Sequence, residues 1–493
     1  MLVLSIESSC DETSLAIMDL PVEDELGLQS FGDSLKTNIV QAFGKITILG
    51  HIISSQVSIH AQYGGVVPEI GAREHAEVIH LLFDKVIQEA VNNYSSDSKI
   101  PKTKQDVLDN IQYIFVTTEP GLKAGLRVGQ EFAKSVQFYL GLNNEEYPVN
   151  FVATPFPCRV QGSDWSKSSL HFLQKGNLQK NTLNPNKKVQ IIEVNHLNGH
   201  IFSAFWNQSL VNLGNKETQA KTALSNAKDN SNQNLVFPQL HLLVSGGNTQ
   251  LIEIDENLNT MIIARTLDDA SGECFDKCAR MLGLDYPGGA TLSRIAGVYE
   301  SKINTSLATS NNSLVKNKTT NTPKPKLQYL SVGMMNSDPN FSYSGLKTAL
   351  RYAIESITRA TGLLTLEKKL TAIEITNLLD SSYNLSGNPK LELVAQLCYE
   401  AQYCIIQQLY NKTKLAIINN QKSSDSNYQS LGLSGGVSAN PLLRFKFQNE
   451  LQELLNNQEN QKVYIAPLEL TGDNAVMIAL AGIVKLAGNK DKT

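Results

Sequence analysis

The stretch LHLLVSGGNTQLIEI, residues 240–254, contains two short apolar runs on either side of a glycine-rich turn. Apolar runs of this length, bounded by turn residues, predict β-strands. The two adjacent glycines of the turn allow backbone N–H groups to come close to an anion. We therefore expect a strand, a phosphate-binding turn and a return strand.

The first residues of the chain repeat this arrangement. Leu2–Ile6 and Leu15–Met18 are apolar and flank a polar turn that contains Glu7, Asp11 and Glu12. Carboxylates in a turn suit a cation or an amine better than a bare phosphate, and an ordinary acidic turn is the alternative. Two such hairpins, one in each half, predict an internally duplicated α/β fold.

A third turn, SGGVSAN at residues 434–440, follows the short apolar run Leu431–Leu433 and leads into a helix at Pro441. A glycine turn that feeds a helix N-terminus suits a nucleoside or a phosphate, because the first N–H groups of the helix point at the ligand. We therefore expect a nucleotide cleft between the glycine-rich turns.

The sequence NHLNGH, residues 195–200, follows an apolar run that predicts a buried strand and leads into a predicted helix. His196 and His200 would share one helix face and could bind a single divalent metal ion. The alternative is a pair of ordinary histidines, because short motifs match by chance. Asp473, at a strand-to-helix junction, is a candidate third ligand or a helix N-cap.

Composition is that of a globular protein without a membrane span. The chain has 493 residues, of which 41% are apolar and 18% charged, so we expect at least two domains. The net charge of −4 gives no general attraction for nucleic acid, and any RNA contact must use a local patch. Lys123 with Arg127, and Lys347 with Arg351, are candidate patches, with solvated helix faces as the alternative.

Six scattered cysteines do not predict a disulfide framework in a chain of this size. Cys274 and Cys278 are four residues apart on a predicted helix, where an apolar face is favoured over a metal site. The N-terminus carries neither a secretory signal nor an Arg- and Ser-rich presequence.

Polar segments interrupt the predicted elements, and we interpret them as insertions or linkers. They are residues 92–110, 162–186, 207–234, 301–326, 419–427 and 456–461. The expected domains are an N-terminal lobe at 1–237, a C-terminal lobe at 238–473, and a C-terminal helix at 474–493 that packs on the N-terminal lobe. Residues 207–234 and 301–326 are expected to be low-complexity insertions in these lobes.

Taken together, eight stretches resemble the tRNA threonylcarbamoyladenosine transferases, a family once called glycoproteases, in its bacterial and mitochondrial branch. The resemblance spans nearly the whole chain in order, apart from the polar insertions. The stretches are IESSCDETSLAI (6–17), HAQYGGVVPEIGAREH (60–75), NHLNGH (195–200), LLVSGGNTQLI (242–252), LDDASGECFDKCARMLGLDYPGG (267–289), FSYSGLKT (341–348), LSGGVSANPLLR (433–444) and GDNAVMIALAG (472–482).

The resemblance implies an actin-like, sugar-kinase-like (ASKHA) fold with two RNase-H-like lobes around a nucleotide cleft. It implies transfer of a threonylcarbamoyl group from threonylcarbamoyl-AMP to the exocyclic amine of the adenosine 3′ to the anticodon, in tRNAs that read ANN codons. The implied partners are tRNA and a separate synthase that makes threonylcarbamoyl-AMP. One divalent metal ion, such as iron or zinc, and a homodimer are also expected.

The resemblance also assigns site residues. The metal ligands are His196, His200 and Asp473, and the acidic residues needed for activity are Asp11 and Glu12. The substrate-binding residues are Leu243, Val244, Ser245, Gly246, Gly247, Asp276, Gly289 and Asn440. The chain departs from the family at Asn195 and Asn248, where histidines are frequent, and at Gly472, which replaces a hydroxyl residue before the aspartate.

Two other functions compete with the transferase. A metallopeptidase is disfavoured because Leu197 stands where the HExxH motif has its catalytic glutamate. The other is an actin-like scaffold that binds ATP and catalyses no reaction. Such a scaffold would need only the two hairpins, whereas the set of His196, His200 and Asp473 favours a site beyond nucleotide binding. The Asn-rich insertions and the branch favour a mitochondrial location, and the missing presequence leaves the cytoplasm as the alternative.

Overall fold

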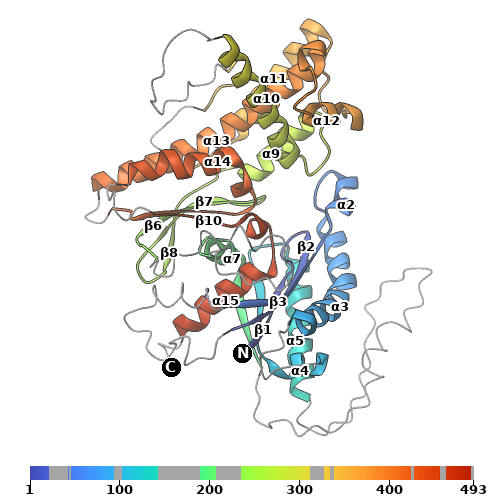
Figure 1. Cartoon of the computed structure of the whole chain (residues 1–493), viewed down its shortest axis with the longest axis vertical. Helices are drawn as coiled ribbons and strands as arrows, with labels where there is room; N and C mark the ends of the chain where they lie inside the picture. The colour runs from blue at the N-terminus through green and yellow to red at the C-terminus, as the bar shows by residue number, and fades with distance from the viewer. Residues whose placement is uncertain are drawn as a thin grey trace, which may run out of the picture.

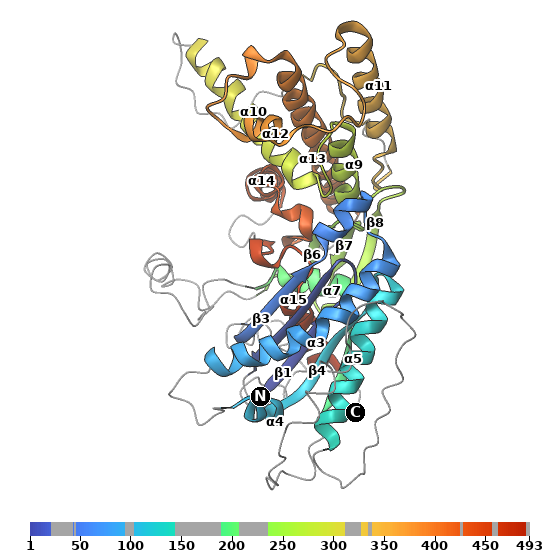
Figure 2. The same cartoon turned by 90° about the vertical axis from the view of Figure 1, so that its right-hand side faces the viewer.

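The computed structural model describes residues 1–20, 43, 46–93, 103–142, 189–206, 235–310, 327–333, 338–423, 427–455 and 462–489. The predicted insertions 162–186, 207–234 and 456–461 lie outside these residues. Within the described part, the elements form two lobes that meet along the middle of the molecule (Figures 1 and 2).

The N-terminal lobe is built on a five-stranded sheet in the order β3-β2-β1-β4-β5. β1 and β2 form the predicted hairpin, with Glu7 opposite Ser14, and β3 continues the antiparallel part. β4 and β5 are parallel to β1 and lie on its other side. The strands are β1 (Leu2–Glu7), β2 (Glu12–Asp19), β3 (Thr47–Ser55), β4 (Ile111–Glu119) and β5 (Gln190–Asn195).

The C-terminal lobe repeats this topology in a sheet with the order β10-β9-β6-β7-β8. β6 and β7 form the second predicted hairpin, with Val244 opposite Thr249, and β9 runs parallel to β6. This repetition confirms the predicted internal duplication. The strands are β6 (Gln239–Val244), β7 (Thr249–Ile254), β8 (Thr260–Arg265), β9 (Ser430–Ser434) and β10 (Lys462–Ile465).

Helices cover the outer face of each sheet, and two helices lie between the sheets (Figure 1). The N-terminal lobe carries α2 (Val57–His60), α3 (Pro68–Asn93), α4 (Lys104–Asn110) and α5 (Lys123–Leu142). The C-terminal lobe carries α9 (Ser271–Met281), α10 (Gly289–Ser310), α11 (Ser344–Thr361), α12 (Ala372–Leu379), α13 (Pro389–Ser423) and α14 (Pro441–Phe445). The inner pair is α7 (His196–Ser203) and α15 (Ala475–Asn489).

The inner pair of helices joins the two lobes through one apolar core. α15 is almost entirely apolar and packs against β1, β5 and α7, while α7 also contacts β6 and β9 of the other lobe. The shared core includes Val3 and Phe115 from the first sheet and Leu243 and Ile252 from the second. The site residues at the start of α7 are therefore fixed against both sheets at once.

Three local expectations are wrong. Residues 301–310 belong to α10 rather than to an insertion, because that helix packs along α13 and continues through polar sequence. Residues 419–423 belong to the end of α13 rather than to an insertion. The stretch 92–110 is not all linker, because it ends in α4.

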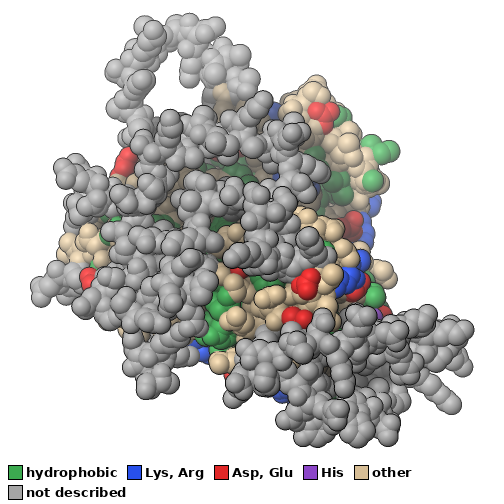
Figure 3. Space-filling view, turned by 60° about the horizontal axis from the view of Figure 1, so that its bottom comes forward, with side chains coloured by type: hydrophobic (Ala, Val, Ile, Leu, Met, Phe, Trp, Pro, Cys, Tyr) green, Lys and Arg blue, Asp and Glu red, His purple; other side chains and the backbone are tan. Residues whose placement is uncertain are grey.

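The described surface carries side chains of both charges, as expected from a net charge of only −4. On the face shown in Figure 3, described Lys and Arg side chains are interspersed with Asp and Glu. In the part of the chain that the structure describes, no helix is both long enough and apolar enough to cross a bilayer.

Candidate functional site

The two histidines of NHLNGH lie one turn apart at the start of α7, and both are buried. The helix begins directly after β5 because Asn195 caps it: its Oδ1 accepts hydrogen bonds from the N–H groups of Leu197 and Asn198 at 2.9 and 3.4 Å. Asn195 is thus engaged as a cap, which agrees with its exclusion from the predicted ligands.

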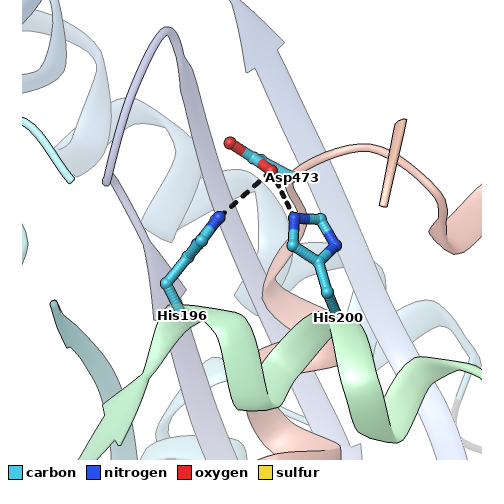
Figure 4. A group of neighbouring side chains, drawn as sticks. All are labelled: His196, His200 and Asp473. Atoms are coloured by element: carbon cyan, nitrogen blue, oxygen red, sulfur yellow. Dashed lines mark ion pairs between the residues drawn. The ribbon is translucent and has the colours of Figure 1, made fainter. Parts of the chain in front are cut away.

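Asp473 reaches the two histidines from the loop before α15 (Figure 4). Its Oδ1 lies 3.1 Å from His200 Nε2 and 3.5 Å from His196 Nε2. The possible ligand atoms of all three residues lie within 4.8 Å of one another. The N-cap alternative for Asp473 is wrong, because the Asn474 side chain accepts the hydrogen bond from the Met477 N–H at 2.9 Å.

The cluster fits a divalent metal ion. His200 is completely buried; its Nε2 lies against Asp473 Oδ1, and its Nδ1 has no hydrogen-bond partner among the described residues. A buried imidazole left in this state is costly unless a ligand completes it. Two imidazoles and one carboxylate are a donor set suited to zinc or iron, and three protein ligands leave a position open for substrate.

The charges in the cluster depend on one another. Burial alone would lower the pKa of His196, but the carboxylates of Asp473 and Glu7 raise it to about 9. Burial would raise the pKa of Asp473, whereas the two imidazoles lower it. In the metal-free protein the cluster therefore holds a proton where a cation would bind.

The turn that carries Asp11 and Glu12 faces the metal cluster and the opposite lobe. Burial raises the pKa of Glu12 to about 9, and the nearby charges of Asp473 and Asp11 add to this effect. In the opposite lobe, burial and then the charge of Asp11 raise the pKa of Tyr286. The structure thus brings the predicted acidic pair beside Asp473, next to the loop that precedes Gly289.

Two buried histidines hold this turn in place, and the sequence analysis did not assign them a role. His75 Nε2 donates to the backbone oxygen of Cys10 at 3.0 Å, while its Nδ1 accepts from Thr13 Oγ1 at 2.7 Å. Gln56 links His75 to His60 through hydrogen bonds of 3.2 and 3.1 Å. The signal was available in the stretch 60–75, which begins and ends with a histidine.

The glycine-rich turns of the C-terminal lobe meet at one place. The Ser245 N–H donates to the Asn248 oxygen at 2.8 Å and closes the hairpin turn, which leaves Gly246 and Gly247 exposed at its tip. A Cβ on Gly272, in the first turn of α9, would lie 2.7 Å from the Ser245 oxygen. Gly435 has a φ of 88° and passes the Val244 oxygen so closely that no side chain fits.

The other predicted substrate residues have different environments. Asp276 Oδ1 accepts a hydrogen bond from the Gly289 N–H at 2.7 Å, so these two act together. Asn440 caps α14 and donates to Ser293 and Gln402, and its side chain is fully engaged within the protein. The side chains of Leu243 and Val244 are completely buried, which leaves them the role of supporting the hairpin.

The predicted basic patches are mostly paired. Lys347 forms an ion pair with Asp269, which also binds Lys277. Arg351 pairs with Glu355 at 2.9 Å on its own helix. These contacts favour a structural role for the α11 patch over a contact with RNA.

Comparisons with known proteins agree with this geometry. The sequence profile of the tRNA N6-adenosine threonylcarbamoyltransferase family matches residues 47–153 and 220–480. The tRNA N6-adenosine threonylcarbamoyltransferase of Fervidobacterium nodosum is 30% identical, with 100% of this chain and 95% of that protein aligned. Those of Thermosipho africanus and Francisella philomiragia are 29% and 28% identical, aligned over 98% and 99% of this chain and 93% and 95% of theirs.

The matched residues include β6, β7, both glycine-rich turns of the C-terminal lobe and the first residues of α15, whereas α7 lies between the two matched ranges. The matches cover well over half of the chain, and the actin-like, sugar-kinase-like architecture of two repeated sheets is the one expected for this family. The chain belongs to the tRNA N6-adenosine threonylcarbamoyltransferase family.

Proposed function

We propose that the protein transfers the threonylcarbamoyl group of threonylcarbamoyl-AMP to the exocyclic amine of the tRNA adenosine 3′ to the anticodon. The amine nitrogen forms a bond to the carbamoyl carbon, the bond from that carbon to the phosphate oxygen breaks, and AMP leaves as the amine loses a proton. One observation carries this proposal: the His196, His200 and Asp473 cluster, on a helix that contacts both sheets, in a chain of this family.

His196, His200 and Asp473 would hold the divalent metal ion. When bound, the ion supplies a Lewis acid and a template for the carbonyl group under attack. The two histidines are shielded from solvent, since His196 is 6% exposed and His200 is not exposed at all, while the Asp473 side chain is 19% exposed. A fixed site is suited to a weak nucleophile, since orientation supplies much of the rate.

The glycine-rich turns would bind the adenylate part of the substrate. Backbone N–H groups at the exposed Gly246 and Gly247 can approach a phosphate because no Cβ intervenes. Such donors offset the negative charge that remains on the phosphate of the leaving AMP. Asp276 and Gly289, held together by their hydrogen bond, lie in the same lobe and are proposed to line the nucleoside end.

Asp11 and Glu12 are proposed to take the proton that the adenosine amine loses. With a pKa of about 9, Glu12 is mostly protonated near neutral pH, and its small ionised fraction is a strong proton acceptor. We expect Asp11→Asn and Glu12→Gln to lower the rate of transfer by about 10²–10⁴-fold if each acts as a base, measured in single turnovers with metal content unchanged. Full-rate transfer by both amide variants would exclude this role.

The finer assignments remain proposals. We propose that a separate synthase supplies threonylcarbamoyl-AMP, that the chain forms a homodimer, and that it works in mitochondria. The three relatives compared above come from bacteria. The proposed mitochondrial location rests on the Asn-rich insertions and the branch of the family, with the cytoplasm as the alternative. Light scattering would determine the mass in solution, and a fluorescent fusion would locate the protein.

The proposed function is tested by transfer in vitro. The purified protein is supplied with a synthase that makes threonylcarbamoyl-AMP, threonine, bicarbonate, ATP and unmodified tRNA that reads ANN codons. We expect threonylcarbamoyladenosine in digested tRNA from the wild type and none from His196→Ala. Absence of product with the wild type, even after addition of bacterial partner subunits, together with binding of labelled ATP, would support the scaffold instead.

A further inference from the structure

We propose that Glu7 is a positioning residue for the metal centre: its carboxylate fixes the tautomer and ring orientation of His196. The sequence suggested that Glu7 faces a cation directly, in the same turn as Asp11 and Glu12. The structure instead places Glu7 behind the cluster, on the side of His196 opposite to Asp473. The inference rests on the proposed metal site but not on the transfer reaction.

Glu7 is the last residue of β1 and is completely buried. Its Oε2 lies 3.2 Å from His196 Nδ1 and accepts a hydrogen bond from Thr117 Oγ1 at 2.5 Å. Its Oε1 accepts a hydrogen bond from the Ser9 N–H at 2.6 Å. The carboxylate is thus held by β1, by the first turn and by β4, and it presents a fixed acceptor to the ring.

This contact decides which nitrogen of His196 carries the proton. An ionised carboxylate only accepts hydrogen bonds, so Nδ1 must carry its hydrogen when it faces Glu7 Oε2. The Ser9 hydroxyl lies 3.1 Å from the same nitrogen and satisfies the ring from a second direction. In the neutral ring, the lone pair is then on Nε2, the atom that points to Asp473 and to the metal position.

His200 provides an internal contrast. Its ring is as deeply buried and its Nε2 also faces Asp473, but its Nδ1 has no hydrogen-bond partner among the described residues. Nothing that the structure describes behind His200 sets its tautomer. Of the two imidazoles, His196 is therefore the pre-oriented ligand, and the orientation comes from a residue nearly two hundred positions earlier in the chain.

Loss of this acceptor has a specific consequence. A glutamine at position 7 has the same shape but offers either an N–H or an oxygen to Nδ1, so the ring is no longer restricted to one tautomer. Removal of an outer partner of a metal-bound histidine typically lowers metal affinity by about 10–100-fold. We expect Glu7→Gln to weaken zinc binding by about this factor and to change the ligand-field spectrum of bound Co²⁺.

Glu400→Gln is the matched control. Glu400 is an equally buried carboxylate that accepts hydrogen bonds from the N–H groups of Tyr329 and Leu330, both at 2.9 Å. It lies on α13, on the outer side of the C-terminal sheet. A general loss of stability from a buried carboxylate would appear in both variants, whereas the change in metal binding is expected in Glu7→Gln alone.

The experiment measures zinc affinity by competition with a chelator, and the Co²⁺ absorption spectrum, on full-length wild type, Glu7→Gln and Glu400→Gln. If Glu7→Gln fails to fold, Thr117→Val removes one hydrogen bond to the same carboxylate and is expected to give a smaller loss in the same direction. Wild-type affinity and an unchanged spectrum in the folded variant would overturn the inference. A wild type that binds no metal would instead contradict the proposed metal site.

Discussion

At the scale of single residues, a proton and a metal ion compete for the side chains of His196, His200 and Asp473. In the metal-free protein, burial alone would lower the pKa of His196, yet Asp473 and Glu7 raise it to about 9. This protonated ring contributes stability below the pKa of an unfolded histidine, and that contribution is lost as pH rises toward 9. Metal binding must displace the proton from Nε2, because an imidazolium cannot act as a ligand.

The competition gives a prediction for pH. Zinc affinity is expected to rise about tenfold per pH unit between pH 7 and 8.5, because one proton is released from His196 for each ion bound. The rise should level off above pH 9. Isothermal titration calorimetry in buffers of different ionisation enthalpy would count the protons. Affinity that is independent of pH in this range would contradict the charge assignment.

Residues in contact within one turn were predictable, and residues that meet across the fold were not. The i, i+4 spacing of His196 and His200 indicated a shared face directly. Asp473 entered through family resemblance, because spacing alone favoured a helix cap. The role of Glu7 behind His196 depends on how β1, β4 and α7 meet, and no local pattern in the sequence encodes that meeting.

At the scale of elements, α15 positions Asp473 because it packs tightly on the first sheet. A Cβ at Gly482 would lie 2.6 Å from the ring of Phe115 on β4, whereas one at Gly297 in α10 would meet nothing within 4 Å. The absence of a side chain at Gly482 thus allows close contact between helix and sheet. Asp473 lies in the loop directly before α15, about two helical turns before Gly482.

The two glycines give opposite predictions. Gly482→Ala is expected to destabilise the protein by about 1–3 kcal/mol, because the methyl group forces the ring of Phe115 to move. Gly297→Ala is expected to stabilise it by up to about 1 kcal/mol, because alanine favours the helix and the site is open. Urea unfolding followed by circular dichroism compares them. Equal effects of the two substitutions would show that contact with Phe115 does not matter.

Element prediction succeeded where the signal was local. Both hairpins and the helix at Pro441 were found from apolar runs and glycine turns. α4 was missed although Thr103 and Asp106 form a reciprocal capping box, because the short helix lies in polar sequence. β8 was missed because it is an edge strand with Met261 and Ile262 exposed, so it lacks the pattern of a buried strand.

At the scale of the whole molecule, the duplication places the site. The N-terminal hairpin turn and the C-terminal glycine turns lie at equivalent ends of equivalent strands, and the acidic turn of one lobe lies near Asp276 and Tyr286 of the other. α7 and α15 fill the space between the sheets and carry the three metal ligands or the loop next to them. A movement of one lobe against the other would therefore change the distance between the proposed metal and adenylate sites.

The central claim is that the His196, His200 and Asp473 cluster binds one metal ion that transfer requires. The most direct measurement strips the wild-type protein with a chelator, titrates zinc or iron(II) back, and records single-turnover transfer to tRNA at each step. We expect transfer to rise with metal and to level off at one ion per chain, and Asp473→Asn to show neither tight binding nor transfer. Full-rate transfer by the stripped protein would contradict the account.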